Sequence, residues 1–81
     1  MNEKPEVDLI DFHYQQIIKS EELGYKKSKT STTQGILVAL ALADRRFAES
    51  SWRDEPVEAL HAKLDEPQTE ALKKFRKERG L

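Results

Sequence analysis

The chain has 81 residues and no cysteine, and its 14 basic and 15 acidic side chains give a formal net charge of −1. This length suffices for one domain, 1–81, and the lack of cysteine excludes disulfides and the common cysteine-rich zinc sites. The charge balance argues against a protein that coats nucleic acid through its overall charge, although a local basic patch stays possible.

The first predicted element is a helix over residues 5–23. Pro5 suits a first helical turn, and Gly24 is a typical residue directly after a helix C-terminus. At 100° per residue the apolar side chains fall on one stripe, formed by Val7, Ile10, Tyr14, Ile17 and Ile18. Leu9 and Phe12 lie off that stripe. The pattern predicts a helix that packs on one side and carries further apolar residues elsewhere.

A basic loop is predicted over residues 24–31 and a second helix over residues 32–50. Ser31 and Gln34 have capping-box spacing, in which Ser31 would accept from the Gln34 amide and the Gln34 side chain would reach back. The apolar run that follows covers every face, which is typical of a helix surrounded by protein. Because short neighbours would barely cover it, we expect a homodimer formed through this helix and part of the first. Its core or dimer positions would be Ile36, Leu40 and Phe47.

Two further helices are predicted over residues 55–64 and 67–79. Each follows or includes an Asp-Glu-Pro start signal, and Asp65 and Gln68 have the spacing of an N-cap pair. No segment shows strand alternation between turn signals. The predicted fold class is therefore all-α, a small bundle of about four helices with the second at its centre.

Residue patterns typical of enzymes and metal proteins are weak in this chain. There is no glycine-rich phosphate loop and no Gly-x-Ser-x-Gly turn. Glu58 and His61 have the Glu-x-x-His spacing of helical-bundle metal sites, but those sites need a second copy and more glutamates. A surface pair of His61 with Asp65 is the preferred interpretation. We expect no catalytic residue, no metal ligand and no cofactor.

Apolar residues away from the main stripes favour binding to another protein. Phe12 lies off the stripe of the first helix, and Trp52 stands next to Arg53 before the third helix. Aromatic residues near arginine are typical of interface centres, although the same residues could complete the core of a small bundle. We predict a non-catalytic regulatory or inhibitory module that acts through protein–protein binding. Its contact residues would be Phe12, Trp52 and Arg53.

The alternative function is a nucleic-acid-binding regulator. Its contacts would come from the basic loop and the last helix, through Lys26, Lys27, Lys29, Lys73, Lys74, Arg76 and Lys77. The cations of the last helix also complement its dipole, and they could pair with the acidic first helix instead. Protein binding and nucleic-acid binding therefore both stay open. The affinity for nucleic acid would fall steeply with salt, whereas the affinity for an apolar protein surface would change little.

Membrane and targeting segments are not predicted. The longest apolar run, residues 35–43, is far shorter than the ~20 residues that span a bilayer. The first apolar stretch is interrupted by Asp8, Asp11 and His13, unlike a secretory signal. We expect a cytoplasmic protein without membrane contact.

Overall fold

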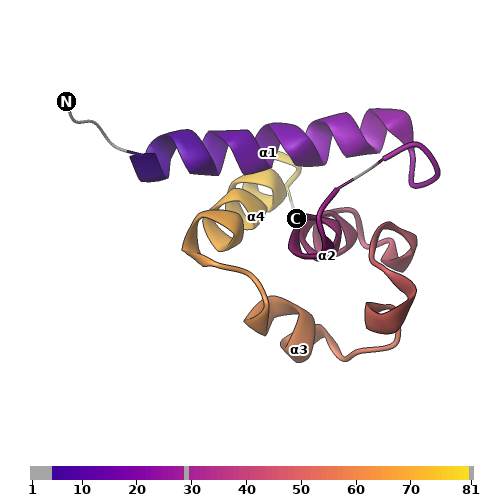
Figure 1. Ribbon diagram of the computed structural model, residues 1–81. Coiled ribbons are helices and arrows are strands. Elements are labelled where there is room, and N and C mark those ends of the chain that lie inside the picture. The colour runs from indigo at the N-terminus through magenta and orange to yellow at the C-terminus, as the bar shows by residue number, and fades with distance from the viewer. Residues whose placement is uncertain (1–4, 29, 81) are drawn as a thin grey trace.

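The computed structural model describes residues 5–28 and 30–80, which form an all-α bundle (Figure 1). Its α-helices and short 3-10 helices are α1 (Pro5–Leu23), α2 (Thr32–Leu42), η1 (Arg45–Phe47), η2 (Ser50–Trp52), α3 (Val57–Ala62) and α4 (Glu66–Glu78). These described residues contain no strand, so the predicted fold class is confirmed. None of the helices described is long and apolar enough to cross a membrane.

The first helix has the predicted bounds. It ends at Leu23 because Gly24 turns the chain with a φ of 83°, and the Gly24 amide donates to the Ser20 carbonyl oxygen at 2.9 Å. Glycine adopts this left-handed conformation without the steric cost that a side chain brings. The apolar stripe is confirmed for Ile17, which is fully buried, and for Tyr14 and Ile18, which pack against the core. The side chain of Val7 lies outside the described part of the structure.

The predicted second helix over residues 32–50 is wrong in its C-terminal part, because α2 ends at Leu42. Ala43 has a φ of 55° and its amide donates to the Leu40 carbonyl oxygen at 3.4 Å, while the Asp44 amide donates to Ala39 at 3.0 Å. This pair of bonds is a Schellman ending. The Asp44 carboxylate then accepts from the Arg46 amide at 3.0 Å and begins η1. Such local side-chain bonds compete with helix continuation, and apolar periodicity does not report them.

The last two helices begin and end near their predicted bounds. α3 is shorter than the predicted 55–64, and α4 begins and ends one residue before the predicted 67–79. The Asp65–Gln68 pair is confirmed as a complete capping box. The Asp65 carboxylate accepts from the Gln68 amide at 2.9 Å, and the Gln68 side-chain oxygen accepts from the Asp65 amide at 3.0 Å. These two bonds satisfy backbone donors at the start of α4.

The centre of the bundle is α2 (Figure 1). Every residue of this helix from Gln34 to Ala41 is buried. α1, α3, α4 and η1 pack around it. Ile36 and Leu40 therefore lie in the core of this chain, and Phe47 packs against that core while partly exposed. The homodimer stays a prediction, but covering α2 does not require one.

A buried amide pair links the first turns of α2 and α4. Ser31 Oγ accepts from the Gln34 amide at 3.3 Å, as predicted. The second half of that capping box is wrong, because the Gln34 side-chain oxygen accepts from Gln68 Nε2 at 2.9 Å instead of Gln34 reaching back to Ser31. Gln34 Nε2 is buried without a hydrogen-bond partner among the described residues. The contact between α2 and α4 thus leaves one buried donor unsatisfied, which is energetically costly.

Candidate functional site: the outer face of α1

Three large apolar side chains are exposed on the side of α1 that faces away from the core. Leu9, Phe12 and Leu23 are 45%, 51% and 44% exposed. At 3.6 residues per turn these positions fall within about 60° around the helix axis, with Gln16 between them and Lys19 at the edge. We call the set Leu9, Phe12, Gln16, Lys19 and Leu23 the outer face of α1.

The opposite side of α1 is anchored to α4. The Tyr14 and Phe75 rings are 6.4 Å apart between centroids. Lys74 Nζ lies 3.9 Å from Asp11 Oδ1. Because several contacts join the two helices along their length, the outer face is held in one orientation.

Charged pairs complete this α1–α4 contact. Arg79 Nη1 donates to Glu21 Oε2 at 3.0 Å, and this guanidinium lowers the pKa of the Glu21 carboxyl below its ordinary value. The Tyr14 hydroxyl donates to the Glu78 carboxylate, and that bond raises the pKa of the phenol. Pairing of the acidic first helix with the basic last one therefore occurs within the chain.

The predicted contact residues Trp52 and Arg53 lie apart from this face. Trp52 is half-buried and packs against the core, with Lys63 Nζ 5.0 Å from its ring centroid. Arg53 Nε donates to the Ala48 carbonyl oxygen at 2.9 Å. η2 and α1 do not pack closely against each other. Of the three predicted contacts, only Phe12 belongs to the outer face of α1.

Arg45 secures the segment between α2 and α3. Arg45 Nη1 donates to the carbonyl oxygens of Arg53 at 2.8 Å and Glu55 at 2.6 Å. Together with the bond from Arg53 to Ala48, this holds η1 and η2 in place. A run of arginines predicts surface charge, and nothing in the sequence pattern indicates which carbonyl groups the guanidinium would reach.

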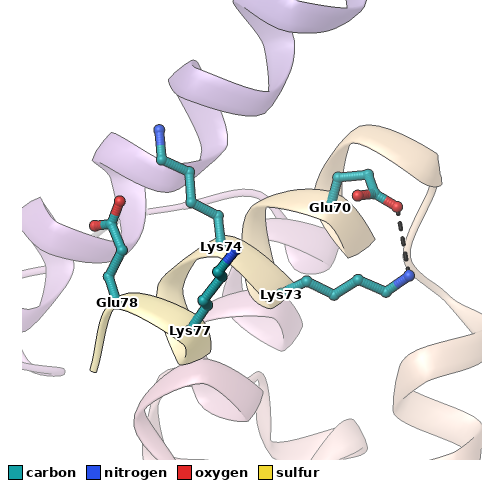
Figure 2. Close-up of a pocket in the computed structure, with 5 residues that line it drawn as sticks. All are labelled: Glu70, Lys73, Lys74, Lys77 and Glu78. Atoms are coloured by element: carbon teal, nitrogen blue, oxygen red, sulfur yellow. Dashed lines mark hydrogen bonds and ion pairs between the residues drawn. The ribbon is translucent and has the colours of Figure 1, made fainter. Parts of the chain in front are cut away.

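The lysines of α4 gather around an open depression of about 600 Å³ (Figure 2). Lys73, Lys74 and Lys77 line it together with Glu70 and Glu78, so that acids offset most of the positive charge. Lys73 Nζ lies 3.5 Å from Glu70 Oε2. Figure 2 shows Lys74 and Glu78 pointing toward α1, where Lys74 Nζ is 4.4 Å from the Tyr14 ring centroid.

The remaining cations of the nucleic-acid prediction are distributed elsewhere. Arg76 is half-buried on α4. Lys26 and Lys27 are exposed in the turn after α1, and Lys27 lines a different depression from the α4 lysines. Lys29 lies outside the described residues. The two predicted basic segments therefore do not share a depression.

That second depression, of about 280 Å³, lies between α1 and the turn that follows it. Its lining residues are Gln16, Lys19, Ser20, Leu23, Lys27, Ser28 and Thr30. Ser28 Oγ donates to Ser20 Oγ at 2.9 Å and joins the turn to the helix. Sequence analysis singled out Lys27 but missed Lys19. The two lysines line one depression because the turn after α1 folds back onto that helix, which the sequence pattern does not indicate.

Metal-binding groups do not assemble in the parts of the chain that the structure describes, where no three His, Asp or Glu side chains are placed to hold an ion. The expected His61–Asp65 pair is also not formed within these parts. Instead, the Asp65 carboxylate caps α4. His61 is thus left as a half-buried residue of α3.

In the described residues, the fold is all-α, and its surface carries the exposed apolar outer face of α1 and the lysine-containing depressions at α4 and beside α1. Comparisons with models of known protein families, with curated proteins and with solved structures find no match to this chain.

Proposed function

We propose that this chain is a small non-catalytic regulatory or inhibitory module that binds another protein through the outer face of α1. The observation that carries this proposal is the exposure of Leu9, Phe12 and Leu23 on one side of a single helix. Isolated apolar side chains are common on protein surfaces, whereas several on one helix face form the kind of surface that amphipathic partners bury.

The energetic contribution of this face sets a requirement on the partner. Complete burial of a large apolar side chain stabilises by ~1.5–3 kcal/mol, so burying the exposed half of three such residues contributes about 3 kcal/mol. Micromolar binding requires about 8 kcal/mol. The partner must therefore also engage polar groups around the apolar residues.

The charge on the face indicates what those polar groups are. Lys19 is the charged residue of the outer face, and Lys27 lies beside it across the adjoining depression. A partner segment with apolar residues and at least one acidic residue complements this arrangement. Because α1 is anchored to α4, the face needs little ordering on binding, which favours affinity.

A peptide library displayed on phage and selected against the purified protein tests this proposal. We expect enrichment of peptides that combine apolar and acidic residues, and loss of their binding to the Phe12→Ala variant. Val57→Ala is the matched control, because Val57 is 47% exposed but lies on α3. Enrichment of basic peptides, no enrichment, or equal losses in both variants would contradict the proposal.

Nucleic-acid binding is the second candidate function. It is supported by the three lysines around the α4 depression and by the exposed Lys26 and Lys27. Glu70 and Glu78 in the same depression weaken its attraction for phosphates. A salt titration with a DNA duplex separates this function from the first.

A further inference from the structure

The depression between α1 and the following turn has an unusual charge content. Both charged residues that line it, Lys19 and Lys27, are basic. Neither forms an ion pair with any residue that the structure describes. In contrast, Lys73, Lys74 and Arg79 each pair with an acid.

Local structure explains how the two lysines come together. α1 places Gln16, Lys19, Ser20 and Leu23 on one side, at the spacings that share a helix face. The turn then folds back, with the Ser28 amide donating to the Gly24 carbonyl oxygen at 3.0 Å. The Ser28–Ser20 hydrogen bond fastens this turn to a serine that is only 2% exposed.

Polar groups suited to an anion also line the depression. Among the described residues, the Thr30 hydroxyl and the Gln16 side-chain amide have no hydrogen-bond partner, and both carry donors. Thr30 lies directly before Ser31, the N-cap of α2, but the Glu49 carboxylate accepts from the Thr32 hydroxyl at 2.9 Å and so lies at the start of this helix. This acid offsets the positive end of the α2 dipole, so the two lysines supply the attraction for an anion.

Lys19 and Lys27 bring two positive charges to one small depression, and an anion with two charges balances both. Ligand sites for drug-sized molecules usually occupy ~300–1,000 Å³, so a depression of about 280 Å³ suits a small ligand. We propose that this depression binds the dianionic phosphoryl group of a phosphomonoester, with Lys19 and Lys27 as its charged contacts. This site is a claim separate from peptide binding, although Gln16, Lys19 and Leu23 belong to both surfaces.

Titration with inorganic phosphate at constant ionic strength, followed by amide NMR shifts, tests the site. We expect saturable shifts at Lys27, Ser28 and Thr30. Affinity should fall about tenfold in Lys19→Gln and in Lys27→Gln, since each loses one charge-assisted contact. It should also fall as pH drops through the second pKa of phosphate, because the ligand then loses its second charge.

Two controls make the outcome decisive. Lys77→Gln removes an exposed cation from the α4 depression, and we expect it to leave phosphate affinity unchanged. Dimethyl phosphate carries a single charge, as does the phosphodiester of a nucleic-acid backbone, and we expect it to bind at least about tenfold more weakly. Equal binding of both phosphates, shifts confined to α4, or no saturable shift would overturn the proposal. Because the probe is inorganic phosphate, the result does not depend on whether α1 binds a protein.

Discussion

Gly35 is the position at which a single added methyl group tests the packing of α2 most directly. It lies in the first part of the helix and is buried. A Cβ atom at this position would lie 2.7 Å from the carbonyl oxygen of Phe47 and 3.4 Å from Thr30 Oγ1. The first of these contacts is with backbone, which no side-chain rotation relieves. Gly35→Ala therefore requires η1 to move away from α2.

Two opposing effects determine the size of the change. Alanine in place of glycine inside a helix stabilises by about 1 kcal/mol through propensity alone. Overpacking a close-packed site costs about 1–3 kcal/mol, and a rigid backbone neighbour places Gly35→Ala near the upper end. We expect a net loss of about 1–2 kcal/mol. For a domain of this size, that loss lowers the melting temperature by roughly 4–16 °C.

Thermal and urea unfolding followed by far-UV circular dichroism measures this effect. Ala62→Gly, at the exposed C-terminal end of α3, is the control for propensity, and we expect it to cost no more than about 1 kcal/mol. A Gly35→Ala protein that melts several degrees above the parent would refute the close contact with Phe47.

Four further predictions concern the helix ending, one ion pair, the alternative function and the homodimer. Ala43→Gly should stabilise the protein by about 0.5–1 kcal/mol, because Ala43 is exposed with a φ of 55°; a lower urea midpoint would contradict this. Arg79 lowers the pKa of Glu21, so this pair should stabilise the folded protein at pH values above the ordinary pKa of 4.5. That stabilisation should be lost as the pH falls through the lowered pKa. Glu21→Gln should then be less stable than the parent at neutral pH, with a loss of at most about 1 kcal/mol in the free energy of unfolding. At a pH well below the lowered pKa of Glu21, the two proteins should be equally stable, and an equal difference at both pH values would refute the linkage. If the lysines bind duplex DNA, log affinity should fall with log salt at a slope of about −0.9 per neutralised phosphate, and a salt-independent affinity would exclude that function. Light scattering in the same buffers should show about twice the chain mass of 9.4 kDa if the predicted homodimer forms, and a single chain mass would exclude it.

Helix boundaries set by neighbouring residues were predictable from the sequence. Gly24 ends α1 at Leu23, and the Asp65–Gln68 capping box begins α4. Both depend on groups within a few residues of each other, so the pattern in the chain is enough to identify them. The off-stripe position of Phe12 also indicated its exposure, because a helix that packs on one side leaves the other side free.

Other features depend on contacts between residues that are distant in sequence, and only the tertiary structure decided them. Gln34 bonds to Gln68 rather than to Ser31, and Trp52 packs against the core while half-buried. Lys19 and Lys27 line one depression because the turn after α1 folds back onto that helix. Periodicity and capping act within a few residues, whereas burial and the grouping of charges depend on how the helices pack in three dimensions. The sequence by itself therefore determined the all-α class, the bounds of α1 and the cap of α4, and the packing decided which side chains form surfaces.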